Sequence, residues 1–336
     1  MNSRTRWLAL TIVAAVIIAA ATVYGVTAFL GYQQRQSAAS VGAVAADPLA
    51  GPRIVFRNTT AGAGYGHVAA VPLADHAGPR SVTEQTCDRV YETAKNLVCL
   101  RVDRGVVTTF EGMLFDSAGK KLRSWPLPGI PSRTRLSPDS RLVASTAFVT
   151  GMSYATVGFS TQTVIAGTDG HQYGNLEDFT TTIDDRQLTA TDRNFWGVTF
   201  SDDGNTFYAT AASGGRTWLV RGNLAERTMT AVHPDAECPS LSPDGRHVAY
   251  KKNVSTGPVS FWAVAVLDLE SGDERVVAEK HSVDDQVEWL DNDNLLYGLP
   301  RAGAAGDSDI WRIPIDGTSP PTLYIKHAWS PSVLRE

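Results

Sequence analysis

Residues 237–250 read Glu-Cys-Pro-Ser-Leu-Ser-Pro-Asp-Gly-Arg-His-Val-Ala-Tyr, and this stretch decides the fold. Its centre, Ser-Pro-Asp-Gly at 242–245, has the composition of a β-turn. Proline fixes φ, aspartate hydrogen-bonds to its own backbone, and glycine accepts a positive φ. The Val-Ala-Tyr run at 248–250 favours a strand. The stretch therefore predicts two short strands joined by a tight turn.

Weaker copies of this pattern lie at residues 135–144, 199–208 and 288–297. The first two copies are separated by 64 residues, and the later spacings are 41 and 47 residues. A period of about 40 to 50 residues with several short strands per unit is typical of propeller blades. The surplus of about 20 residues in the third unit falls around residues 151–174, where longer strands or an extended loop would absorb it.

Short apolar runs between turn signals predict an all-β chain folded as a six-bladed propeller. The blades other than the third are expected at residues 54–83, 87–128, 195–232, 238–278 and 287–325. The first of them offers three strands where four are expected. Beyond the sixth, residues 329–332 read Trp-Ser-Pro-Ser, which echoes the start of a blade. We expect this tail to supply the missing strand, because ring closure removes two exposed sheet edges.

Composition excludes one class of partner. The chain has 336 residues, of which 43% are hydrophobic and 19% charged, which is ample for a large core. Its formal net charge is −5, and its first 40 residues hold three arginines and no acid, so the remainder is more acidic still. A domain of that sign lacks the basic surface that binds phosphate backbones, so no nucleic-acid partner is expected.

The N-terminal segment predicts a membrane anchor. Residues 7–30 carry no charge, are rich in Ala, Val, Ile and Leu, and as a helix would cross a bilayer core of about 30 Å. Arg4 and Arg6 precede them, so the positive-inside rule places the N-terminus in the cytoplasm and the rest outside. The expected parts are a cytoplasmic N-terminus at 1–6, a transmembrane helix at 7–31, a flexible linker at 32–52 and the propeller at 53–336.

A cleaved signal peptide is the alternative, with Ala43-Val44-Ala45 as a possible processing site. The apolar region of a signal peptide is about 7 to 15 residues long, shorter than the one here, and it normally ends near the cleavage site. No cysteine precedes Cys87, which excludes a lipoprotein-type attachment near the span. The expected location is therefore the cell membrane, with a single span and an extracytoplasmic propeller.

The repeat at 241–250 resembles that of TolB-like propellers. Asn-Phe-Trp-Gly-Val-Thr-Phe at 194–200 and Ser-Val-Asp-Asp-Gln at 282–286 are similar to membrane-anchored TolB-like proteins of actinomycetes. The resemblance covers about residues 53–336 and implies the fold. TolB relatives act as periplasmic interaction proteins, and similar propellers also carry hydrolases. TolB has a further N-terminal globular domain where this chain has an apolar segment, so the resemblance does not imply a part in a Tol system.

Two of the three cysteines are expected to form a disulfide. Cys87 and Cys99 fall on the two arms of one predicted hairpin, and a register that pairs Tyr91 with Lys95 sets them opposite each other. Outside the cytoplasm such a pair oxidises, although two reduced core cysteines are the alternative. Cys238 is left over and is expected to be a buried strand residue.

The candidate binding residues are those that lead into the first strand of each blade, because these segments converge on one mouth of the central channel. Mixed charges beside aromatic rings suit recognition of a polar partner, although they could also merely balance one another around a water-filled channel. The candidates are Asp88, Arg89, Arg133, Arg135, Asn194, Phe195, Trp196, Glu237, Asp284, Asp285, Gln286 and His327. No catalytic residue, cofactor or metal ligand is expected, since the seven histidines lack the spacing of metal ligands.

The leading hypothesis is a monomeric, membrane-anchored binding or scaffold protein. Its propeller face or channel mouth would bind a protein or cell-envelope component without catalysis. The alternative is a propeller hydrolase or lyase that acts on a small ester, lactone or sugar with a channel-mouth metal or acid/base pair. The residues available for that chemistry are Asn194, Glu237, Asp284, Asp285 and His327.

Overall fold

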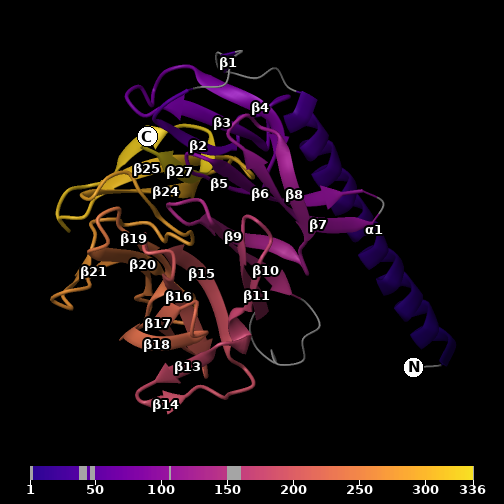
Figure 1. Ribbon diagram of the computed structural model, residues 1–336. Helices are drawn as coiled ribbons and strands as arrows, with labels where there is room; N and C mark the ends of the chain where they lie inside the picture. The colour runs from indigo at the N-terminus through magenta and orange to yellow at the C-terminus, as the bar shows by residue number, and fades with distance from the viewer. Residues whose placement is uncertain (1–2, 38–43, 46–49, 106, 150–159, 336) are drawn as a thin grey trace. The chain divides into compact units, whose positions relative to one another are not determined.

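The computed structural model describes residues 3–37, 44–45, 50–105, 107–149 and 160–335 (Figure 1). Its one long helix is α1 (Ser3–Ser37). Within α1, the 25 residues Trp7–Gly31 have a mean hydropathy of 2.3, and their side chains are exposed. By length and composition this segment could cross a membrane or serve as a signal sequence.

Six β-sheets form the blades of a propeller (Figure 1). From the innermost strand outward, blade 1 consists of β27 (Ala328–Leu334), β2 (Arg53–Asn58), β3 (His67–Pro72), β4 (Arg80–Thr86) and β1 (Val44–Ala45). Blade 2 consists of β5 (Arg89–Glu92), β6 (Asn96–Arg104), β7 (Thr108–Asp116) and β8 (Lys121–Pro126). Blade 3 consists of β9 (Ile130–Leu136), β10 (Leu142–Val149), β11 (Ser160–Gly167) and β12 (Gln172–Asn175).

Blade 4 is the largest sheet, with β15 (Asn194–Phe200), β16 (Thr206–Ser213), β17 (Arg216–Asn223), β18 (Thr228–Pro234), β13 (Thr180–Ile183) and β14 (Arg186–Gln187). Blade 5 consists of β19 (Glu237–Leu241), β20 (His247–Asn253), β21 (Trp262–Asp268) and β22 (Glu274–Val276). Blade 6 consists of β23 (Glu288–Trp289), β24 (Asn294–Pro300), β25 (Ser308–Pro314) and β26 (Thr322–Ile325). The innermost strands β27, β5, β9, β15, β19 and β23 are neighbours in that order around the channel.

The repeated turn has the geometry that its composition predicts. In the copy at 242–245, the Gly245 amide donates to the Ser242 carbonyl at 2.9 Å, and Gly245 has a φ of +71°. The Ser242 hydroxyl donates to Asp244 at 2.5 Å. In the copy at 137–140, Ser140 takes the glycine position with a φ of +66° and makes the same backbone bond to Ser137. Turn chemistry therefore fixes where each innermost strand ends.

Closure by the C-terminal strand is confirmed. β27 pairs antiparallel with β2, with Val333 opposite Ile54 and Ser332 opposite Val55. The Ser332 hydroxyl also accepts the Glu92 amide of blade 2 at 2.9 Å, so β27 bonds to the blades on both of its sides. The last strand of the chain thus completes the first blade: it covers the edge of β2 and becomes the innermost strand of that sheet.

The prediction about the surplus residues was wrong. The extra chain forms a 3-10 turn, η1 (Leu176–Asp178), and then β13 and β14, which extend blade 4 from four strands to six. β13 pairs in parallel with β18, with Thr181 opposite Met229. Leu176 and Phe179 are buried in the cluster that joins blades 3 and 4, which explains why this segment packs on blade 4. Residues 150–159, part of the predicted insertion, lie outside the described residues.

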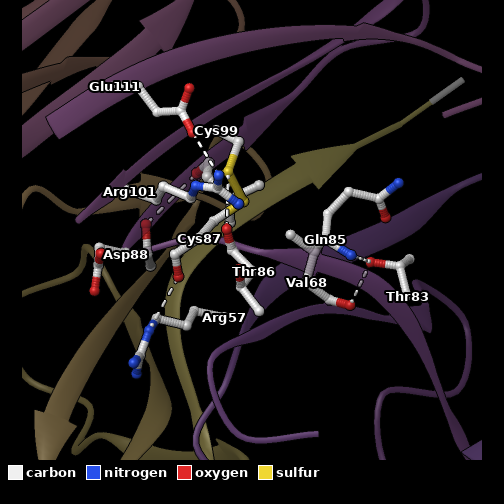
Figure 2. Close-up of a disulfide and its surroundings, with 12 residues drawn as sticks. Arg57, Val68, Thr83, Gln85, Thr86, Cys87, Asp88, Cys99, Arg101 and Glu111 are labelled. Carbon is white, nitrogen blue, oxygen red and sulfur yellow. Dashed lines mark hydrogen bonds and ion pairs between the residues drawn. A yellow bond between two sulfur atoms is a disulfide. The ribbon is translucent and has the colours of Figure 1, made fainter. Parts of the chain in front are cut away.

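The Cys87–Cys99 disulfide is present, but the register that predicted it was wrong (Figure 2). Cys99 lies opposite Val90, and Cys87 precedes β5 altogether. The two Cα atoms are nevertheless 5.4 Å apart, within the range of a disulfide. Arg57 of blade 1 donates to the Cys87 carbonyl at 3.0 Å, and this bond helps to place the cysteine beside its partner. Cys238 is free and buried, as predicted.

Removal of this disulfide is expected to lower the free energy of unfolding by about 3 kcal/mol, because the bridge restrains a loop of this size in the unfolded chain. The measurement is urea denaturation of the Cys87→Ser/Cys99→Ser double variant beside the parent. The parent treated with reductant should shift its midpoint to that of the double variant. The double variant itself should not respond to reductant, and an equal midpoint in all samples would contradict the prediction.

A polar cluster joins blades 4 and 5. Glu274 accepts hydrogen bonds from Lys252 at 2.5 Å and from Tyr250, and it lies 3.0 Å from the His233 ring of blade 4. Burial alone would raise the pKa of Glu274, but these three partners outweigh it and lower the pKa to about 2. The ionised carboxylate is therefore more favourable in the folded chain than in the unfolded one.

Stability is expected to fall on acidification in a way that depends on Glu274. Its contribution is present above pH about 4.5, the ordinary range of a glutamate, and is lost as the pH falls towards 2. Urea midpoints of the parent and of Glu274→Gln should therefore differ at pH 7 and converge between pH 4.5 and 2. Glu270→Gln, on an exposed turn of the same blade, is the control and should follow the parent throughout.

Candidate functional site

The channel has two ends that differ in chemistry. We call the end where the innermost strands begin the entry mouth and the opposite end the exit mouth. The entry mouth holds the starts of β5 and β19 and the chain that leads into β23. The exit mouth is lined by the turns that follow β9, β15 and β19. Most of the predicted binding residues lie near the entry mouth.

Three of the predicted residues form one buried cluster inside the entry mouth. The Asp285 carboxylate is 3.0 Å from the Arg89 guanidinium of blade 2 and 3.9 Å from that of Arg133 in blade 3. Asp285 is only 2% exposed. Burial, followed by the nearby charge of Arg133, lowers the pKa of Arg89. A cavity of about 20 Å³ remains here, which is room for about one water molecule, so side chains fill this part of the channel.

A second ion pair lies deeper and spans the channel. Arg135 of blade 3 and Glu288 of blade 6 stand on opposite sides of the ring, with 2.7 Å between Nη1 and Oε2. Burial would lower the pKa of Arg135, but Tyr91 and Glu288 outweigh it and raise the pKa. Burial, together with Glu288, raises the pKa of Tyr91 to about 12. The side chains of this ion pair block the channel axis. A ligand that enters from either mouth would therefore meet two opposite charges that cancel each other.

The rim of the entry mouth is where charge reaches solvent. The Lys251 ammonium is 2.5 Å from Asp284 and 3.7 Å from Glu237, and it packs over the Trp262 ring at 4.3 Å. Burial raises the pKa of Glu237 in spite of Lys251. Burial would also raise the pKa of Asp284, but the charge of Lys251 outweighs this effect, so the pKa of Asp284 is lowered. The Asp284 side chain is 70% exposed, whereas its partner Lys251 is buried.

Other predicted residues serve the packing of the blades. The side-chain Oδ1 of Asn194 accepts from the Thr161 backbone amide at 3.0 Å and from the Thr161 hydroxyl at 2.6 Å, which ties blade 4 to blade 3. Phe195 and Trp196 are buried, at 1% and 6% exposure. The side-chain Nε2 of Gln286 donates to the Pro239 carbonyl at 2.7 Å and so holds β19 in place.

Asp88 and His327 also lie apart from the rim. Asp88 accepts the Val102 amide at 2.7 Å within blade 2. The His327 ring is 2.8 Å from Asp307, and its backbone amide donates to Asp309 at 2.8 Å. His327 therefore fixes the chain that leads into β27. Of the predicted residues, seven lie together in and around the channel, namely Arg89, Arg133, Arg135, Glu237, Asp284, Asp285 and Gln286.

Sequence reasoning missed the exit mouth. A pocket of about 120 Å³ lies there, bordered by the repeated turns, with Asp202, Asp244 and Arg335 among its polar residues. Arg335 donates to the Trp289 carbonyl. The signal for this pocket was the recurrence of the turn itself, because equivalent turns in successive blades meet at one end of the channel.

The five residues named for a metal-dependent reaction do not converge on one point, although Glu237 and Asp284 share Lys251. Asn194 is bonded to Thr161, Asp285 is paired with Arg89, and His327 lies against Asp307. Among the residues that the structure describes, no three His, Cys, Asp or Glu side chains are grouped so that they could hold a metal ion.

The fold is that of a six-bladed β-propeller. The structure is similar to the crystal structure of TolB from Acinetobacter baumannii, with a TM-score of 0.57 and 16% identity over 84% of this chain and 66% of that one. This chain thus spans slightly less than two thirds of that relative. A chain of the nidogen/laminin complex is similar with a TM-score of 0.56 and 10% identity over 84% of this chain and 98% of that one. No family model and no curated protein matches the sequence.

Proposed function

We propose that this chain is a membrane-anchored, extracytoplasmic binding protein that recognises a protein or cell-envelope partner at the entry side of its propeller. The observation that carries the proposal is an exposed apolar groove beside the charged rim. The groove encloses about 750 Å³ between blades 5 and 6 and is lined by Phe261, Leu299 and Trp311 together with Lys280 and Arg301. Contiguous exposed apolar surface rimmed by polar residues marks interaction sites.

The loop between β20 and β21 enlarges this surface. It follows Lys251 along the chain, and its backbone is held by the bond from the Val254 amide to the Phe261 carbonyl at 3.0 Å. Val259 is 80% exposed and Val254 46% exposed. Asp284 lies on the same rim through its bond to Lys251. The surface combines apolar anchors with a charged edge, which suits a macromolecular partner.

The location rests on two further features. The apolar segment Trp7–Gly31 supports an anchor, with the propeller on the extracytoplasmic side. The Cys87–Cys99 disulfide supports an oxidising compartment. Protease treatment of intact cells should digest the propeller and spare an epitope at the N-terminus. A mature protein whose N-terminal sequence begins near Ala46 would contradict the proposed anchor, because the apolar segment would have been removed.

The binding surface can be tested by site-specific photo-crosslinking in the native envelope. A crosslinking residue at Val259 should give one dominant adduct, and the same residue at Val232, an exposed valine on the outer part of blade 4, should not. Asp284→Arg should reduce the adduct formed from position 259 at least fivefold. Equal labelling at both valines, or an adduct insensitive to Asp284→Arg, would refute the proposed surface.

A further inference from the structure

Blades 2 and 3 are separated by a cleft of about 250 Å³ that the sequence did not predict. One wall is the face of blade 3 that carries three directly opposed pairs on β10 and β11. These pairs are Val143 with Ala166, Ser145 with Val164, and Ala147 with Gln162. Since alternate residues of a strand share one face, all six side chains point to the same side of the sheet.

The opposite wall belongs to blade 2. Leu114 on β7 lies opposite Arg123 on β8, and Gly112 lies opposite Trp125 on the same face. The indole of Trp125 folds over Gly112 so closely that a Cβ on this glycine would lie 2.3 Å from the ring. Glycine at position 112 thus lets the ring lie flat and leaves the space in front of it open.

The cleft exists because small side chains stand where the other interfaces have large ones. Between blades 3 and 4, Phe195 and Phe207 fill the core, and between blades 5 and 6, Trp289 and Tyr297 do so. At the cleft, β10 and β11 of blade 3 present only alanine, serine, valine and one glutamine. Deeper in the interface, Leu136 of blade 3 packs with Leu100 and Leu114 of blade 2. The cleft therefore lies beside the packed core that joins the two blades, and its space is open to a small ligand.

The charge of the lining indicates what kind of occupant fits. Among the described residues that border the cleft, Arg123 is the one charged side chain, and no acid is present. Its guanidinium reaches across to the β11–β12 turn, where a Cβ on Gly170 would lie 1.7 Å from Nη1. Two amides and three hydroxyls also line the cleft, from Gln162, Gln172, Ser124, Ser145 and Thr168. The cleft therefore combines apolar surface with uncharged polar groups and has a cation at one end.

We propose that the cleft between blades 2 and 3 binds a small apolar carboxylate of the fatty-acid type. Its chain lies between Trp125 and the Val164–Ala166 face, and its carboxylate pairs with Arg123 at the end near Gly170. An apolar cavity of about 150 Å³ already holds benzene, so this cleft has room for a short alkyl chain. Arginine is suited to the charged end, because its planar fork binds carboxylates in a bidentate manner. This site is separate from the entry-mouth surface and does not depend on it.

The test is calorimetric titration of the full chain with octanoate, with the parent and all variants in the same detergent so that micelle partitioning is common to every sample. The parent should show saturable binding to one site. Arg123→Gln should weaken it at least tenfold, since a charge-assisted bond is lost. Lys121→Gln, a change of equal charge on the same strand but outside the cleft, should bind like the parent.

Two further samples complete the test. Ala166→Phe, which fills the cleft, should abolish saturable binding while the protein unfolds at the same or a higher temperature. Octyltrimethylammonium, the cationic analogue, should bind the parent at least tenfold more weakly than octanoate, and this preference should disappear in Arg123→Gln. No saturable binding to the parent, or equal octanoate affinity in the parent and Arg123→Gln, would overturn the proposal even if Ala166→Phe failed to fold.

Discussion

Deletion of residues 327–336 is expected to unfold the propeller as a whole rather than to remove one strand from it. The deletion takes away β27, in which Ala328, Val333 and Leu334 are buried. It also uncovers Ile54 and Phe56 on β2, which are fully buried in the closed ring. Each such side chain is worth about 1.5 to 3 kcal/mol when it is buried. The sum is comparable with the entire stability of a folded domain, about 5 to 15 kcal/mol.

The deletion would also leave an open sheet edge on β2, so aggregation should accompany unfolding. The measurement is thermal unfolding followed by circular dichroism, with size-exclusion chromatography to detect aggregates. A chain that ends at Arg335 keeps all of β27 and is the matched control. A shortened chain that melts within a few degrees of the control would show that closure of the ring contributes little.

Loss of one partner of the Arg135–Glu288 pair is expected to cost about 3 to 5 kcal/mol, because it leaves the other charge buried without compensation. Both side chains are less than 10% exposed, and they come from blades on opposite sides of the channel. Glu288→Gln should therefore lower the free energy of unfolding sharply. The double variant Arg135→Met/Glu288→Leu should recover much of the loss, since apolar side chains of similar volume often replace a buried pair without penalty.

The pair Arg101–Glu111 provides the control for this cycle. It is as short, at 2.6 Å, but its side chains are 35% and 28% exposed. Glu111→Gln should change the stability by less than about 1 kcal/mol, because partly exposed ion pairs are weak. Urea denaturation of the parent and these three variants gives the comparison. If Glu288→Gln behaves like Glu111→Gln, the cross-channel pair does not stabilise the ring.

The charged side chains at the entry mouth differ in how accessible they are to a partner. At the entry mouth, Arg89 and Arg133 share the single carboxylate of Asp285, and all three side chains are largely buried, so little of their charge is available to a partner. Asp284 is the exception because it is exposed and stands beside the apolar loop that carries Val259. A partner would thus meet a surface with one charged edge, which favours specificity over raw electrostatic attraction.

The predicted strands, turns and ring closure follow from short-range chemistry. The turn at 242–245 forms as its residues dictate. The tail at 328–334 pairs with β2 because β2 has a neighbour on one side only, β3, and the tail has no hairpin partner of its own. The register around Cys87 was not predictable in the same way. This register depends on the contact with Arg57 of another blade and on the position of Cys87 before the start of β5. Neither feature can be read from the spacing of the cysteines.

For the predicted site residues too, the sequence indicated their positions on the strands but not their contacts. The sequence located charged and aromatic residues at the starts of strands, but the partner of each side chain was decided by the curvature of the ring. Asp284 and Asp285 are adjacent in sequence and have the same charge, yet one is exposed at the rim and the other is buried against Arg89. Adjacent residues of an extended chain point to opposite sides, so a small shift in where a strand begins exchanges their roles.

The sequence by itself therefore determined the architecture of this protein. Six repeats, a tail that completes the first blade and an apolar N-terminal segment can be identified from residue type and spacing, because turns and apolar periodicity are local. Only the tertiary structure decided the plug of ion pairs in the channel, the placement of β13 and β14 on blade 4, and the cleft in front of Trp125. These features depend on contacts between side chains far apart in sequence and on the volume left between packed sheets, which no single stretch of the chain specifies.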